Sequence, residues 1–372
     1  MKTKDNIRAV VFSNEDSHSS LVKKFNSIEK AEKYIYNDDN ELSDILHHLQ
    51  LQNFNSKEVV ILKKFRGRFF QKCPGTPHMI CCNYYVCNTC FNCLYDCTYC
   101  FLNQYLNSFG IIQFSNIDEF YHVFENELSL HEGSDTILRV GPGEFTDTLM
   151  FDELTGISKR LIEISSHYAN VMLELKTKSD NIQHILDIKN KGNTVIAWTL
   201  SPERNILLYE KDTAGLKQRI DAARLASQSG YNIAFHFDPV IIYKEWKNDY
   251  YRILDMVFEN IEQSKLAWIS MGGFRYTPGF KEILKRKFPD QTMTVEEMFP
   301  SIDGKFRYLK NKRIEIYRTI LEHIYKNTET PFVYLCMESS DVWNSVFGRN
   351  YSSSEELEHD FSEHLKKAIL HR

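Results

Sequence analysis

Three thiols lie close together in the stretch Cys93-Leu94-Tyr95-Asp96-Cys97-Thr98-Tyr99-Cys100, at the spacing C-x3-C-x2-C. Each thiolate can bind one iron of a [4Fe–4S] cluster, so three cysteines leave the fourth iron without a protein ligand. That iron is free to bind a small molecule. We therefore predict that Cys93, Cys97 and Cys100 are the metal ligands of an iron–sulfur cluster.

An open iron of this kind binds S-adenosylmethionine in radical enzymes, through the amino and carboxylate groups of the cofactor. An electron from the cluster cleaves the sulfonium and releases a 5′-deoxyadenosyl radical, while the protein positions and shields the reaction. The cofactors expected from the three thiols are therefore a [4Fe–4S] cluster and S-adenosylmethionine.

Two other metal-binding interpretations of the cysteines stay open. A ferredoxin-type run is formed by Cys87, Cys90, Cys93 and Cys97, although the proline that usually follows the fourth cysteine is absent. Zinc could be held by the pairs Cys87-x2-Cys90 and Cys97-x2-Cys100. Only six residues separate these pairs, where about 15 are usual.

Composition places the chain among globular proteins. It has 372 residues, 42% hydrophobic and 26% charged, with a net charge of −5, which argues against an overall basic nucleic-acid binder. We find no signal peptide and no apolar run of about 20 residues that could span a membrane. Nine cysteines without a secretion signal favour metal binding in a reducing cytoplasm over disulfides. Reduced buried thiols suit Cys73, Cys81 and Cys82 better than the dense run.

From about residue 115, strand-like and helix-like segments alternate. The predicted strands are 135–140, 171–176, 194–200, 232–237 and 266–271, and the predicted helices are 117–129, 150–167, 182–191, 216–229 and 250–263. This alternation is typical of βα units with a parallel sheet, and the cluster segment adds one more unit. Roughly six such units predict an α/β fold with an open or partial barrel.

Regions on either side of the barrel are predicted as an N-terminal mixed α/β extension (1–72) and a C-terminal cap (272–372), with the barrel at 73–271. The extension has a strand-like segment at 7–12 and helical segments at 27–36 and 41–51. In the cap we predict helices at 280–287 and 312–326, a strand at 330–335 and a terminal helix from Ser352.

Two segments combine basic and aromatic residues, 63–72 and 305–313. Such segments can grip a phosphate backbone and stack on bases. A solvated strand that covers a core is the alternative. Nucleic acid or a nucleotide is therefore a candidate substrate.

Polar residues follow the predicted strands, at the end of a barrel where ligands bind. Glu144, within 141–147, could pair with an ammonium group, and Lys178 could pair with a carboxylate. Thr199 ends the third predicted strand of the series, and Asp238 follows the fourth. Each residue alone could equally be a helix cap or a satisfied core group, but together they favour a shared site.

From about 70 to about 345 the sequence resembles the spore photoproduct lyase family of radical S-adenosylmethionine proteins. The segments that carry the resemblance are 73–76, the cluster run with 104–107, 143–147, 272–277, 303–305 and 334–339. The resemblance implies a partial (β/α)6 TIM-type barrel of the radical S-adenosylmethionine kind, with the cluster ligands named above. It also implies that the cofactor is bound by Tyr99, Phe101, Gly143, Glu144, Thr146, Lys178, Thr199 and Asp238.

This chain also departs from the family. The founding lyase repairs a thymine dimer in DNA and returns a hydrogen atom from a cysteine just after the second barrel strand, but segment 143–147 has no cysteine. Phe101 stands where the lyase has a tyrosine, although Tyr99 is kept. Tyr99 and Cys336 are therefore the candidate catalytic residues, and burial for packing is the alternative for Cys336.

The resemblance implies that the deoxyadenosyl radical abstracts hydrogen from a substrate such as a DNA thymine photoproduct, with flavodoxin or ferredoxin as reductant. Two alternatives stay open. One is a radical enzyme that acts on another nucleotide or a small molecule. The other is a nucleic-acid-binding protein stapled by zinc or a cluster, without turnover.

Overall fold

The computed structural model describes residues 1–106, 108–293 and 297–370. Its largest element is a sheet of eight strands, in the order β18-β14-β13-β11-β10-β9-β5-β4. These are β4 (Phe70–Lys72), β5 (Tyr85–Cys87), β9 (Leu138–Gly141), β10 (Val171–Thr177), β11 (Val195–Thr199), β13 (Asn232–Val240), β14 (Leu266–Gly273) and β18 (Phe332–Leu335). All neighbours pair in parallel except β4 with β5.

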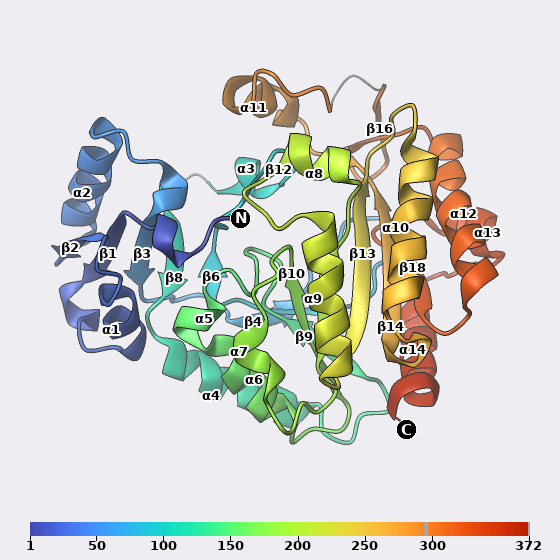
Figure 1. The fold of residues 1–372 in the computed structure, drawn as a ribbon, viewed down its shortest axis with the longest axis horizontal. Coiled ribbons are helices and arrows are strands. Elements are labelled where there is room, and N and C mark those ends of the chain that lie inside the picture. The colour runs from blue at the N-terminus through green and yellow to red at the C-terminus, as the bar shows by residue number, and fades with distance from the viewer. Residues whose placement is uncertain (107, 294–296, 371–372) are drawn as a thin grey trace.

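The sheet curls into a half-barrel. It stays open because its end strands, β4 and β18, do not pair with each other. Helices between the strands cover its outer face (Figure 1). They are α4 (Ile117–Leu130), α5 (Asp152–Thr155), α6 (Ile157–Ser165), α7 (Gln183–Leu186), α8 (Glu203–Tyr209), α9 (Leu216–Gln228), α10 (Trp246–Asn260) and α12 (Lys310–Asn327). Helix α14 (Ser354–Leu365) follows β18, and its Phe361 packs against Trp268 and Phe332. The predicted partial barrel is confirmed.

Strands β10, β11, β13 and β14 are buried along nearly their whole length, as expected of a parallel sheet covered on both faces. Two predicted helices differ from the structure. Residues 150–167 form two helices because Gly156 between them adopts a left-handed φ of 67°. Of 182–191, only α7 is α-helical.

A second sheet lies beside the barrel, at the left of Figure 1, with the strand order β2-β1-β3-β8-β6. Its strands are β1 (Ala9–Ser13), β2 (Glu32–Tyr36), β3 (Val59–Lys63), β6 (Cys90–Phe91) and β8 (Ile111–Phe114), accompanied by α1 (Ser20–Asn26) and α2 (Asp39–Leu51). The sequence did not predict β8. This sheet reaches into the cluster region, because β6 pairs with β8.

The predicted helix at 27–36 is wrong. Its second half is strand β2, which pairs in parallel with β1 from Ala9↔Glu32 to Ser13↔Tyr36. The segment is rich in Glu, Lys and Ala, which favour helices, but the hydrogen bonds offered by β1 outweigh this weak local preference.

The C-terminal region contains a small sheet of β15 (Arg275–Tyr276), β16 (Phe299–Pro300) and β17 (Phe306–Arg307), with helices α11 (Phe280–Lys287) and α13 (Ser340–Phe347). It also supplies β18 to the barrel sheet. The domain boundaries after 72 and 271 stay predictions, and hydrogen-bonded sheets cross both. Among the described helices, none is long and apolar enough to cross a membrane.

Candidate active site

The cluster segment is held between the two sheets. Its start, β6, belongs to the N-terminal sheet. Its middle, β7 (Asp96–Cys97), pairs antiparallel with β12 (Glu210–Lys211), which follows α8 of the barrel. After Cys100 the chain enters the short helix α3 (Leu102–Tyr105). The three predicted ligands therefore lie where extension and barrel meet.

Cys93, Cys97 and Cys100 are free thiols. Burial raises the pKa of Cys93 to about 12 and that of Cys97 well above its usual value, and the other two thiols lie near enough to raise the Cys97 pKa further. Burial also raises the pKa of Cys100, opposed by the ammonium groups of Lys57 and Lys178. Buried thiols exchange their protons for metal. Three neighbouring thiols beside two ammonium groups fit an anionic iron–sulfur cluster.

Within the described part of the chain, no three His, Cys, Asp or Glu side chains are arranged to hold a metal ion. A [4Fe–4S] cluster binds each thiolate through a different iron, so its ligands need not converge on one point. Cys87 and Cys90, which the ferredoxin and zinc interpretations both require, lie on strands of two different sheets, β5 and β6.

Tyr99 is anchored by a buried charge network that the sequence did not reveal. Its hydroxyl donates to Glu210, which also accepts from Ser201 Oγ at 2.6 Å. Arg219 Nη2 lies 2.6 Å from Glu210 Oε2, and both of these side chains are fully buried. The guanidinium also donates to the carbonyl of Thr199 at 2.9 Å. This network ties the cluster segment to the end of β11.

Lys178, which follows β10, lies beside the cluster segment. Its ammonium is 5.6 Å from the centre of the Tyr99 ring. Its backbone N–H donates to Asp147 Oδ2 at 2.7 Å, and Thr177 Oγ1 donates to the other oxygen at 2.7 Å. The loops after β9 and β10 are therefore fastened together, with Lys178 between them and the predicted ligands.

Gly143 and Glu144 lie at the end of β9, against β10. A Cβ at Gly143 would lie 2.9 Å from Thr148 Oγ1 and 3.1 Å from Lys176 Cβ, so a side chain there would force its neighbours to shift. Glu144 is 3.8 Å from the ammonium of Lys176. Burial opposes the charge of Lys176, but the carboxylates of Glu144, Glu174 and Asp238 raise its pKa. Lys176, which the sequence analysis missed, links two sides of the barrel interior.

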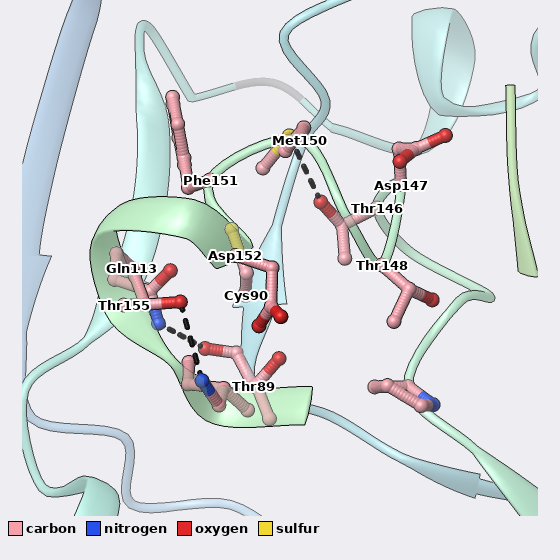
Figure 2. A pocket seen from close by; sticks show the side chains of 12 residues that line it. Thr89, Cys90, Gln113, Thr146, Asp147, Thr148, Met150, Phe151, Asp152 and Thr155 are labelled. Carbon is pink, nitrogen blue, oxygen red and sulfur yellow. Dashed lines mark hydrogen bonds between the residues drawn. The ribbon is translucent and has the colours of Figure 1, made fainter. Parts of the chain in front are cut away.

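Thr146 occupies a different environment. It donates to Met150 Sδ at 3.5 Å and lines an interior cavity of about 20 Å³ together with Cys90 and Asp147, as Figure 2 shows. That volume is roughly enough for a single water molecule. Thr146 therefore contacts the segment around Cys90. Its role as a cofactor ligand stays a prediction.

On the other side of the barrel, Asp238 and Cys336 meet at Arg275, a further residue that the sequence analysis did not select. The guanidinium binds both Asp238 oxygens, at 3.0 and 3.1 Å, and donates to Cys336 Sγ at 3.5 Å. Burial raises the pKa of Asp238, but Arg275 outweighs it and holds that pKa below its usual range. Burial raises the pKa of Cys336 well above its usual value, so the thiol keeps its hydrogen.

Replacing Arg275 with methionine is expected to lower the unfolding free energy at pH 7 by about 1.5–3 kcal/mol, because Asp238 loses a charged hydrogen-bond partner. The depressed pKa means that the pair stabilises the fold above the unfolded carboxyl pKa of about 3.9 and loses this effect as the pH falls further. Urea titrations from pH 3 to pH 8 would test this. The control, Arg252→Met, breaks an exposed pair with Asp249. A pH-independent difference would contradict the prediction.

Phe101 and the segment 104–107 are further parts of the predicted site. Phe101 is 39% exposed and packs edge-on against Tyr105 and Phe145. Asn107, which ends the family-like segment 104–107, lies outside the described residues.

The aromatics of segment 63–72 do not form a stacking surface for bases. Phe69 and Phe70 are buried, and Phe65 stacks on Phe114 with ring centroids 4.2 Å apart. In the second basic segment, Arg307 and Arg313 are buried and pair with Glu338. For the first segment, the alternative of a chain that covers a core describes the structure better than nucleic-acid contact.

A family model and known proteins that match this chain carry the same description. A family model described as spore photoproduct lyase matches residues 50–328. A spore photoproduct lyase of Geobacillus sp. (strain Y412MC61) is 23% identical over 241 residues, which are 62% of this chain and 70% of the relative. One from Clostridium acetobutylicum is 22% identical over 285 residues, 73% of this chain and 80% of the relative.

Solved structures show the same fold. A spore photoproduct lyase variant with one cysteine changed to alanine has a TM-score of 0.76 at 19% identity, over 88% of this chain and 98% of the other. A double variant with bound AdoMet and dinucleoside spore photoproduct has a TM-score of 0.74 at 19% identity, over 90% and 99%. The family model covers well over half of the sequence. The chain therefore belongs to the spore photoproduct lyase family of radical S-adenosylmethionine enzymes.

Proposed function

We propose that the chain binds a [4Fe–4S] cluster through Cys93, Cys97 and Cys100 and uses it with S-adenosylmethionine to start radical chemistry. The observation that carries the proposal is the gathering of these three free thiols beside Lys178 at the end of the barrel. A member of this family with bound AdoMet supports the cofactor. The nine free thiols suit a reducing compartment, and a cytoplasmic location stays a prediction.

When bound, the cluster supplies an electron that cleaves S-adenosylmethionine and yields the 5′-deoxyadenosyl radical. Glu144 offers a carboxylate to the amino group of the cofactor, since its ion pair with Lys176 is long at 3.8 Å and therefore weak. Lys178 offers an ammonium to the carboxylate of the cofactor. Asp238 is held rigid by Arg275 and would orient the adenine edge.

We propose a thymine photoproduct of DNA as the substrate, because a member of the family is known with bound dinucleoside spore photoproduct. The aromatic residues of the basic segments add no support, because the structure buries or packs them. Another nucleotide or a small molecule is the alternative substrate. The expected reductant is a flavodoxin or ferredoxin.

The proposal is tested on protein purified and reconstituted without oxygen and reduced with dithionite. We expect bound iron and sulfide, and deoxyadenosine after S-adenosylmethionine is added. Dinucleoside spore photoproduct should then be converted to two thymidines, measured by liquid chromatography. Zinc in place of iron, with no deoxyadenosine, would indicate instead a binding protein whose fold is stabilised by zinc and that does not catalyse a reaction. Deoxyadenosine without thymidine release would favour another substrate.

Cys336 is proposed as the hydrogen donor to the product radical, because its protonated thiol is held by Arg275. We expect Cys336→Ala to cleave S-adenosylmethionine at a rate close to that of the unchanged protein but to lose most of the thymidine product. The control is Cys73→Ala, which removes another partly buried thiol. Equal product yields from both variants would exclude Cys336 as the donor.

A further inference from the structure

Lys57 is a buried lysine of the N-terminal extension that lies against the cluster segment. It stands in the single 3₁₀ turn Ser56–Glu58, directly before β3, and is only 8% exposed. Its ammonium donates to the carbonyl of Cys93 at 2.8 Å and to Asn92 Oδ1 at 2.7 Å.

The charge of Lys57 is buried beside neutral acceptors. Within residues 1–106, 108–293 and 297–370, its ammonium makes no ion pair with a carboxylate, and both of its hydrogen-bond acceptors are neutral. Burying a charge without an opposite charge is costly. The fully buried Arg219, by contrast, is paired with Glu210. The buried ammonium of Lys57 would therefore be stabilised by an anion nearby.

Asn92 makes the position of Lys57 rigid. Its side-chain oxygen also accepts from the N–H of Cys93 at 2.9 Å, and its side-chain nitrogen donates to the carbonyl of Gly110 at 2.9 Å. Asn92 has a left-handed φ of 74°, which asparagine tolerates better than most residues. Lys57, Asn92 and Cys93 thus form a fixed unit at the first predicted ligand.

We propose that Lys57 is the counter-charge of the iron–sulfur cluster, through which the N-terminal extension sets the reduction potential of the cluster. The inference rests on the proposed function, since it requires the cluster. Three thiolates give the cluster a net negative charge, and reduction adds one electron from an external one-electron donor, with no bond formed or broken. A fixed positive charge beside the thiolates favours the reduced state. Lys57 thus acts on the cluster through its charge and does not itself react.

The test uses the full chain with Lys57→Met and Lys57→Gln, both of which remove the charge, while the glutamine amide can still donate hydrogen bonds. Lys30→Met, an exposed lysine of the same region, is the matched control. The reduction potential of each reconstituted protein is measured by redox titration followed by electron paramagnetic resonance. At a fixed potential, we expect the ratio of reduced to oxidised cluster to fall about tenfold in both Lys57 variants, equivalent to about 59 mV for one electron. The control should match the unchanged protein.

Folding and iron content are checked first by circular dichroism and iron analysis. A folded, iron-loaded Lys57 variant with an unchanged potential would overturn the inference. If neither uncharged variant folds, Lys57→Arg, which keeps the charge, should fold and titrate like the unchanged protein; failure of this variant would assign Lys57 a packing role instead. The proposed function fails separately, if the unchanged protein binds no iron.

Discussion

Replacing Cys100 or Cys97 with alanine is expected to abolish cluster assembly and deoxyadenosine formation. Each thiolate binds its own iron, so a missing ligand leaves two irons of the cube without protein attachment. The measurement is iron and sulfide content after anaerobic reconstitution, followed by deoxyadenosine analysis. The expected loss is to background in both assays. Cys97 is buried and Cys100 is partly buried in the present structure, so stability to urea is measured alongside to show that the variants fold.

Cys87→Ala is the matched control for this pair of variants. Cys87 is a buried thiol of the same dense run, but it lies on β5, paired with Phe70 of β4. We expect this variant to keep its cluster and its activity. The ferredoxin-type assignment makes the opposite prediction, because it needs Cys87 and not Cys100. A cluster that survives in Cys100→Ala and is lost in Cys87→Ala would therefore overturn the ligand set.

Glu210→Gln is expected to lower the unfolding free energy by about 3–5 kcal/mol, the cost of leaving one member of a buried ion pair uncompensated. Arg219 and Glu210 are both fully buried, so solvent cannot replace the lost charge. Tyr99 donates to the same carboxylate, and β12 begins at Glu210 and pairs with β7. We therefore expect weaker iron binding as well as lower stability.

Urea titration and iron content measure the two effects of Glu210→Gln. Glu203→Gln, on the exposed face of α8, is the control and should stay within about 0.5 kcal/mol of the unchanged protein. A Glu210→Gln variant as stable as the control would show that the pair contributes little. Lower stability with full iron content would separate a structural role from one at the cluster.

The sequence correctly predicted features that depend on local spacing. The strands and helices of the barrel follow from runs of apolar residues repeated along the chain, because a βα unit needs a buried strand and an amphipathic helix wherever it occurs. Segment 27–36 shows the limit of this reasoning. Its helix-favouring residues predicted a helix, whereas pairing with β1, a partner some 20 residues away, made β2 a strand.

The environment of the candidate site depended on contacts between distant residues. Glu210 lies 111 residues from Tyr99, Arg275 lies 37 residues from Asp238, and Lys57 lies 36 residues from Cys93. In sequence, each of these charged side chains looks like an ordinary surface residue. Their burial and their partners are set by how the strands are ordered in the two sheets, which local patterns do not encode.

The sequence by itself therefore determined the three candidate cluster thiols, the partial barrel and the strand ends that face the site, because these depend on spacing within short segments. Only the tertiary structure decided which charged groups surround the site. Glu210 pairs with Arg219 next to Tyr99, and Arg275 binds Asp238. Lys57 donates to the carbonyl of Cys93. The physical reason is that a charge acts through space. Its effect depends on the distance and burial that folding creates, and not on separation along the chain.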